Sequence, residues 1–147
     1  MEIFPIIGLP KNIIIGKNWT IYNDCNFEFS ENADLSIGSN VIFSYGVVFC
    51  CNHKIFIGND VQIGEYTSIR DTTHSYADLN VPIKYQNDSS KTIIIKDNVW
   101  IGRGCIIMPG TIINRGVVIG ANSIVKGILE ENSVYAGSPL RLIKKRN

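Results

Sequence analysis

The chain has 147 residues, of which 45% are hydrophobic and thirteen are glycine, and its formal net charge is +1. A chain of this length forms a single domain with a substantial core, and a nearly neutral charge without basic blocks argues against nucleic-acid binding. No apolar run is long enough to span a bilayer. We therefore expect one soluble, cytoplasmic domain over residues 1–147 without a transmembrane segment.

The first segment, residues 1–12, carries no regular pattern and is predicted to be an N-terminal cap. Trp19 occupies a position that holds small residues elsewhere in the chain. We expect Trp19 to close the open end of the fold together with Phe4 and Leu9, because an uncapped end would expose the edges of backbone ladders.

Residues 13–128 are dominated by large apolar residues that recur with a step of six. A helix repeats every 3.6 residues and a strand every two, so a sustained step of six indicates short extended segments that alternate with corners. Three steps make one coil, and the pattern predicts an all-β, parallel β-helix of about five coils. The inward residues are Ile15, Ile21, Phe27, Ile37, Phe43, Phe49, Ile57, Ile63, Ile69, Ile95, Ile101, Ile107, Ile113, Ile119 and Val125.

Small and flexible residues mark the corners and the tight inward slots. Asparagine and aspartate tolerate the left-handed backbone region better than most residues, and they recur at Asn18, Asn40, Asn59, Asn98 and Asn122. The four cysteines have no spacing typical of disulfides or zinc sites. We expect them to be reduced, with Cys25 and Cys105 in small core slots.

The pattern stops between residues 70 and 92, where the sequence is polar and contains Pro82. We interpret this stretch as a loop extruded from the coil, and long loops in tight solenoids are usually functional. Residues 129–147 then leave the repeat as a C-terminal extension. This extension turns at Gly137-Ser138-Pro139 and could end in a short helix.

The repeats IGNDVQ at 57–62, IGEYTS at 63–68 and IGANSI at 119–124 resemble those of the hexapeptide-repeat acyltransferases. DTTHSY at 71–76, DNVWIG at 97–102 and AGSPLR at 136–141 are similar to segments of one branch, the galactoside, maltose and xenobiotic acetyltransferases with the capsule and lipopolysaccharide O-acetyltransferases. The resemblance implies a left-handed β-helix and a homotrimer with active sites between subunits. It also implies acetyl-CoA as donor, without a metal.

A sugar hydroxyl is the expected acceptor, in a cell-surface polysaccharide or its precursor, because no segment resembles the nucleotide-sugar or helical domain of other branches. Transfer to a hydroxyl needs a base, and histidine suits this work. His74 lies where the family carries its catalytic histidine. Asp71 either orients this imidazole or caps the loop through backbone amides, whereas His53 is expected to be a surface residue.

The groove for acetyl-CoA is implied by the same resemblance. Trp100 is expected to form its wall, Gly102 and Ala121 to line it, and the backbone amide of Arg103 to face the thioester oxygen. The candidates for the coenzyme phosphates are Lys126, Arg141 and Lys144. The loop residues Tyr76, Lys84 and Tyr85 are candidates for acceptor binding, or for contacts between subunits.

The residues also bear on other functions and on the mechanism. A metal enzyme of the γ-carbonic anhydrase type needs three histidines, and the chain has two. A covalent intermediate on Cys105 is disfavoured because that residue should face the core, so direct transfer in a ternary complex is expected. An amino-sugar N-acetyltransferase and a non-catalytic scaffold remain as alternatives.

Overall fold

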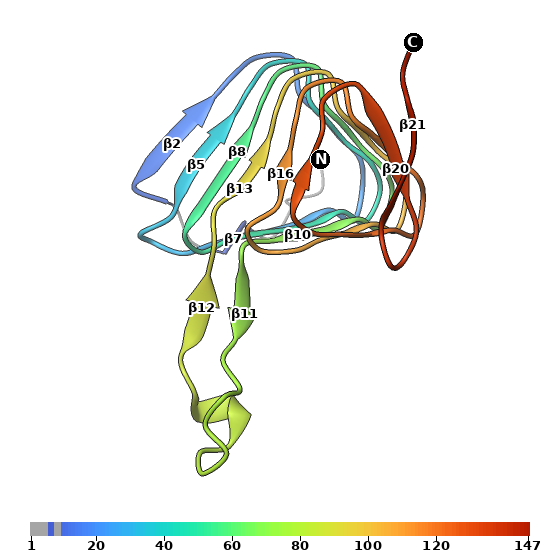
Figure 1. Cartoon of the computed structure of the whole chain (residues 1–147). Coiled ribbons are helices and arrows are strands. Elements are labelled where there is room, and N and C mark those ends of the chain that lie inside the picture. The colour runs from blue at the N-terminus through green and yellow to red at the C-terminus, as the bar shows by residue number, and fades with distance from the viewer. Residues whose placement is uncertain (1–5, 8–9) are drawn as a thin grey trace.

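The computed structural model describes residues 6–7 and 10–147 of the chain. Three parallel sheets form the three faces of a prism, and each is assembled from one strand of every coil (Figure 1). This arrangement fits the left-handed parallel β-helix that was predicted. Phe4 and Leu9, two residues of the predicted cap, lie outside the described residues.

Sheet A consists of six strands in chain order. They are β1 (Ile6–Ile7), β4 (Asn26–Phe29), β7 (Val48–Cys51), β10 (Ser68–Arg70), β15 (Ile106–Ile107) and β18 (Ile124–Val125). Sheet B also has six, which lie side by side on one face in Figure 1. They are β2 (Asn12–Ile15), β5 (Asp34–Ile37), β8 (Lys54–Ile57), β13 (Ile93–Ile95), β16 (Ile112–Ile113) and β19 (Ile128–Leu129).

Sheet C has six parallel strands and a seventh that is antiparallel. The parallel ones are β3 (Thr20–Ile21), β6 (Ile42–Phe43), β9 (Gln62–Ile63), β14 (Trp100–Ile101), β17 (Val118–Ile119) and β20 (Ser133–Ala136). The last strand, β21 (Arg141–Lys145), pairs antiparallel with β20. The extension for which a short helix was considered is therefore a strand.

The described residues form six coils rather than about five. β1 adds a strand before the repeats begin, while β19 and β20 continue the coil beyond residue 128. The step of six does not predict the final coil, because Leu129 follows Val125 by four residues instead of six. The two are joined by a tight corner at Gly127, where φ is +88°. Leu129 is nevertheless buried in register with Ile113, so the core ladder continues.

Inward residues stack on their counterparts in the neighbouring coils and fill the prism. Ile101, for example, lies in register with Ile63 and Ile119, and all three are buried. Strands lie about 4.8 Å apart, which brings such side chains into van der Waals contact. At the first coils the ladder is aromatic, and Trp19 packs on Phe43 with 5.9 Å between ring centroids.

The corners behave largely as predicted. Asn18, Asn40, Asn98 and Asn122 adopt φ between +56° and +59°. Asn59 does not; its side chain accepts a hydrogen bond from the Ser39 amide at 2.8 Å instead.

The stretch between β10 and β13 forms an arm that projects from the prism (Figure 1). Its stem is an antiparallel pair of strands, β11 (Thr72–His74) and β12 (Asp88–Ser90), and its tip contains the 3-10 helix η1 (Ile83–Tyr85). No helix in the described part of the chain has the length and hydropathy that a membrane crossing requires.

Candidate active site

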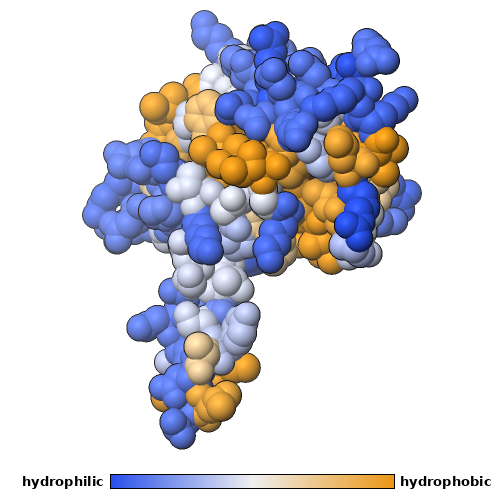
Figure 2. All heavy atoms as spheres, in the orientation of Figure 1, coloured by the Kyte–Doolittle hydropathy of each residue, from blue (hydrophilic) through white to orange (hydrophobic). Residues whose placement is uncertain are grey.

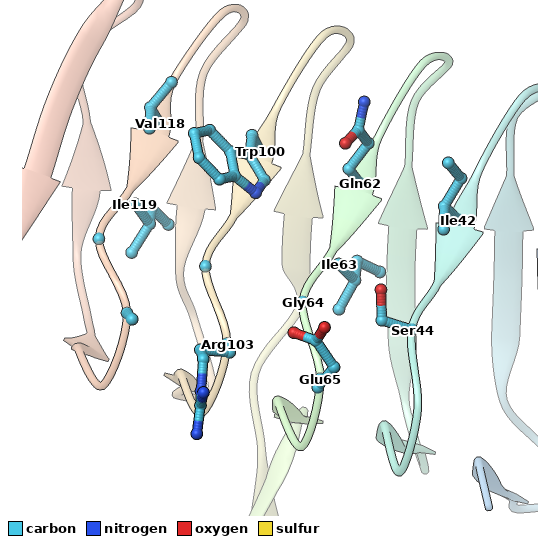
Figure 3. A pocket seen from close by; sticks show the side chains of 13 residues that line it. Ile42, Ser44, Gln62, Ile63, Gly64, Glu65, Trp100, Arg103, Val118 and Ile119 are labelled. Atoms are coloured by element: carbon cyan, nitrogen blue, oxygen red, sulfur yellow. The ribbon is translucent and has the colours of Figure 1, made fainter. Parts of the chain in front are cut away.

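A groove of about 480 Å³ runs across the outer face of sheet C (Figure 3). Side chains alternate along a strand, so the residues next to the buried isoleucines point outward. Trp100 lies in this outward row between Gln62 and Val118, and its side chain is exposed. Of the residues predicted to bind the cofactor, Trp100, Gly102, Arg103 and Ala121 all line this one groove.

Glycines let the corners below Trp100 approach one another. A Cβ atom added to Gly64 would lie 2.5 Å from the Arg103 nitrogen, and one added to Gly102 would lie 2.7 Å from the Ala121 nitrogen. Real Cβ atoms do not make such contacts, so a side chain here would push the coils apart. The absence of side chains leaves the backbone accessible from the groove.

The amide of Arg103 is a hydrogen-bond donor that the fold leaves unused. The neighbouring amides are both engaged, since Gly102 donates to the Ile119 carbonyl at 2.8 Å and Gly104 donates to the Glu65 carbonyl at 2.7 Å. For the Arg103 amide, as for the amides of Glu65 and Ala121 at the equivalent corners of the groove, the described residues supply no acceptor. The Arg103 side chain points away from Trp100 (Figure 3). The guanidinium group therefore does not lie beside Trp100.

His74 lies at the end of β11, on the stem of the arm. Its Nδ1 atom is 2.8 Å from Oδ1 of Asp88, the residue opposite it on β12. Both side chains border a polar hollow of about 280 Å³, which is also lined by Asn52, Arg70, Thr72 and Thr73. The imidazole side chain is 72% exposed, so it is accessible to a bound molecule.

Asp71 is fully buried and does not orient His74. Its carboxylate accepts hydrogen bonds from the backbone amides of Asn52, His53 and Lys54 at 2.8–2.9 Å. It also accepts one from the Thr72 hydroxyl at 3.0 Å. Of the two roles considered for Asp71, the structure shows the bonding to backbone amides, and these amides belong to the corner beneath the arm.

The groove and the hollow at His74 have no lining residue in common. Trp100 belongs to sheet C, whereas the arm leaves the prism between β10 of sheet A and β13 of sheet B. One chain therefore does not bring His74 and the Arg103 amide together in a single pocket.

The predicted phosphate-binding residues lie in different places. Lys144 lines a second hollow with Lys145 and Arg146, and this hollow shares Val118 with the groove. Arg141 is exposed at the start of β21, and Lys126 is exposed beyond β18; neither lines the groove. Only Lys144 is thus adjacent to the groove through a shared residue.

The predicted acceptor-binding residues lie on the outer part of the arm. Tyr76 and Tyr85 are 72% and 69% exposed, and the Lys84 ammonium lies 5.2 Å from the centroid of the Tyr85 ring. None of the three lines the hollow at His74. They are accessible to a second molecule but not gathered around the imidazole.

The four cysteines are buried, and they include Cys105, the residue considered for a covalent intermediate. Cys105 is completely buried, and burial raises the pKa of its thiol, which disfavours the thiolate that a covalent mechanism needs. His53 is exposed at a corner. Within residues 6–7 and 10–147, no group of three His, Cys, Asp or Glu side chains could hold a metal ion.

Asp88 is the residue of this region that the sequence did not reveal. It lies in a polar stretch beside Asn87 and Ser89, where nothing in the residue pattern separates a functional carboxylate from a solvated one. Only the pairing of β11 with β12 places it opposite His74.

Comparison with known proteins identifies the family. The bacterial transferase hexapeptide (six repeats) family matches residues 92–127. WbbJ of Escherichia coli (strain K12), a candidate lipopolysaccharide biosynthesis O-acetyl transferase, is 33% identical over 148 residues, which cover 86% of this chain and 76% of WbbJ. The chain belongs to the hexapeptide-repeat acyltransferase family. The resemblance noted in its repeats is thereby confirmed.

Two further proteins are similar over most of this chain. A galactoside O-acetyltransferase of Lactococcus lactis is 31% identical, over 90% of this chain and 63% of its own length. The crystal structure of a variant of AntD, an N-acyltransferase from Bacillus cereus, in complex with dTDP-4-amino-4,6-dideoxyglucose and coenzyme A, matches with a TM-score of 0.79 and 26% identity, over 98% of this chain and 84% of AntD. The chain thus spans about three quarters of WbbJ and less than two thirds of the galactoside enzyme.

Proposed function

We propose that the protein transfers an acetyl group from acetyl-CoA to a hydroxyl group of a sugar, within a cell-surface polysaccharide or its precursor. The Arg103 amide carries this proposal. It is a backbone hydrogen-bond donor that takes part in no bond of the fold, and it lines the same groove as Trp100. The similarity to WbbJ and to a galactoside O-acetyltransferase supports the sugar hydroxyl. We expect the reaction to take place in the cytoplasm.

Acetyl-CoA would lie along the outer face of sheet C, with its pantetheine arm against Trp100 and Ala121. The coenzyme A bound to AntD supports this donor. Lys144, in the hollow that adjoins the groove through Val118, is the best placed of the predicted cations for the phosphates. Arg141 and Lys126 would contribute only if the coenzyme extends beyond the groove.

The complete site would need two chains of a homotrimer. His74 and the groove occupy separate hollows of one chain, so the arm of one protomer would carry the base to the groove of its neighbour. The outer part of the arm supports such a contact, because Leu79 and Ile83 are 96% and 56% exposed, and hydrophobic side chains are visible on the outer part of the arm in Figure 2. Tyr76 and Tyr85 would then lie at the interface or beside the acceptor.

The reaction would proceed by direct transfer. His74 takes the proton from the acceptor hydroxyl as its oxygen bonds to the thioester carbon. The carbonyl oxygen becomes an oxyanion, which accepts a hydrogen bond from the Arg103 amide. The carbon–sulfur bond then breaks, and the imidazolium returns the proton to the departing coenzyme A thiolate. Protons and bonds balance without a second nucleophile.

An amino-sugar N-acyltransferase is the second candidate, favoured by the similarity to AntD over nearly the whole chain. An amine that is already neutral needs less help from a base than a hydroxyl does. The two candidates therefore differ in how strongly turnover depends on His74.

Replacement of His74 tests the base. We expect His74→Ala to lower turnover about 100-fold or more while the assembly stays folded. Labelled acetyl-CoA would be incubated with methyl β-D-galactopyranoside, maltose and dTDP-4-amino-4,6-dideoxyglucose, and each acetylated product treated with mild alkali, which cleaves esters and spares amides. His53→Ala, at the other histidine, is the matched control and should keep wild-type turnover. Near-normal activity of the His74 variant would show that His74 is not the base. A product that resists alkali would be an amide and would favour the N-acyltransferase.

A mixing experiment tests the shared site. Ala121→Trp should block the exposed groove of its own chain, and His74→Ala should remove the base of its own chain. If each site combines the arm of one protomer with the groove of the next, co-expressed variants should recover about a quarter of wild-type activity, because that fraction of interfaces carries both intact halves. A site built within one chain predicts no recovery from the mixture.

A further inference from the structure

The arm places a carboxylate opposite the proposed base, at a position fixed by the backbone. Within the stem, the Ser75 amide donates to the Asn87 carbonyl at 3.1 Å, and the Lys91 amide donates to the Asp71 carbonyl at 2.8 Å. These bonds define the hydrogen-bonded pairs of the antiparallel ladder. His74 and Asp88 lie between them as a non-hydrogen-bonded pair, the type in which opposite side chains are closest.

The contact fixes which nitrogen of the imidazole holds a proton. A carboxylate only accepts hydrogen bonds, so the 2.8 Å contact between Asp88 Oδ1 and His74 Nδ1 requires a hydrogen on Nδ1. In the neutral ring, Nε2 then carries the lone pair. This atom is the one that could take a proton from an acceptor hydroxyl.

The strand that carries Asp88 is anchored to the prism at its far end. Ser90, on the same face of the ladder as Asp88, has its hydroxyl 2.7 Å from the Thr72 hydroxyl. Thr72 in turn bonds to Asp71, whose carboxylate holds the corner at residues 52–54. A chain of bonds therefore joins the His74–Asp88 pair to the coil beneath it.

We infer that Asp88 is a positioning residue for the reaction, which sets the tautomer and orientation of His74 and stabilises the imidazolium that forms during transfer. The inference rests on the proposed role of His74 as base. Both side chains are more than half exposed in the single chain, so water screens their attraction. Its contribution would grow where a neighbouring protomer and the acceptor exclude that water.

Two substitutions and a matched control test this inference in the full-length assembly. Asp88→Ala removes the acceptor and should lower kcat about tenfold or more, whereas Asp88→Asn keeps the shape, removes the charge and should produce a smaller decrease. The KM for acetyl-CoA should not change, since Asp88 does not line the groove. Ser89→Ala alters the other face of the same ladder and should leave kcat at the wild-type value.

The tautomer gives a readout that is independent of turnover. Nitrogen-15 NMR of the imidazole rings should show His74 protonated mainly at Nδ1 in the wild-type protein and in Ser89→Ala, with mixed tautomers in Asp88→Ala. The chain has only one other histidine, so a His53→Gln background gives a single ring to observe. Because Asp88→Asn is nearly isosteric, it can be measured even if the alanine variant does not fold.

The outcomes separate this inference from the proposed function. An inactive His74→Ala enzyme combined with wild-type kcat in Asp88→Ala and Asp88→Asn would overturn the role of Asp88 alone. Unchanged ring tautomers in both variants would do the same. Full activity of His74→Ala would overturn the base itself, and the positioning role with it.

Discussion

Ile101 in the prism and Leu79 in the arm are both large aliphatic residues, yet the first is completely buried and the second is 96% exposed. Ile101 stacks between Ile63 and Ile119, as every inward residue of the prism does with its own neighbours. The arm has no such core. Its tip is held by the Gln86 side chain, which donates to the carbonyls of Asp78 and Val81 at 2.8 and 2.7 Å.

The two regions differ in what they contribute: the prism contains the buried core, and the arm carries the exposed His74. The prism gains its stability from buried apolar area repeated coil by coil, and none of that core comes from the outer part of the arm. The arm depends on a few polar bonds, and it presents His74 to solvent. Changes in the arm should therefore alter activity with little effect on unfolding, and changes in the ladders should do the reverse.

The largest effect on stability is expected from a gap in the ladder. Ile101→Ala should lower the free energy of unfolding by about 2–5 kcal/mol, because the coils above and below cannot close around the missing methyl groups. Urea unfolding followed by circular dichroism measures this loss. The groove residues beside it need not change contacts, since Trp100 points to the opposite face of the strand.

Leu79→Ala is the matched control in the arm. It removes a side chain of the same class from a position without buried contacts within the single chain, so the free energy of unfolding of the isolated protomer should change by less than about 0.5 kcal/mol. Equal losses in the two variants would show that the arm shares the core of the prism. The contrast drawn between the two regions would then be wrong.

The regular part of the prism was predictable because one physical constraint repeats. A step of six with three faces requires every third inward residue to stack on the same ladder. The placement of Trp100, Arg103 and Ala121 along one groove was instead implied by the family resemblance of their segments. The corner asparagines follow from their tolerance of positive φ. What the repeat did not predict is the final coil, where the short corner at Gly127 shifts the pattern by two residues.

The pairing in the arm was not predictable for a different reason. Thirteen residues separate His74 from Asp88, and the register of a hairpin with a loop of that length depends on the turns at its tip. For Asp71, three residues before His74, the sequence left two roles open: a contact with the imidazole, or hydrogen bonds from backbone amides of the loop. In the structure Asp71 lies at the base of the stem, where its carboxylate meets the backbone of the preceding coil.

A smaller loss of stability than that of Ile101→Ala is expected from a substitution at Asp71, where the arm joins the prism. Asp71→Ala removes a buried carboxylate and leaves the backbone amides of Asn52, His53 and Lys54 without their acceptor, so it should lower the free energy of unfolding by about 1–3 kcal/mol. Native-state hydrogen exchange should be faster at the amides of Asn52, His53 and Lys54, and at that of Ser75 in the stem. Asp97→Ala, in which an exposed corner loses a single bond from the Asn59 amide, should cost less than about 1 kcal/mol because water replaces the carboxylate.

The same variant distinguishes the two roles once considered for Asp71. A carboxylate that holds a corner affects amide exchange at residues 52–54 directly and affects His74 only through the mobility of the stem. A carboxylate that oriented the imidazole would change the ring tautomer and leave those amides protected. Faster exchange at 52–54 with an Nδ1-protonated His74 would thus assign Asp71 to the joint between prism and arm, and it would leave Asp88 as the partner of the base.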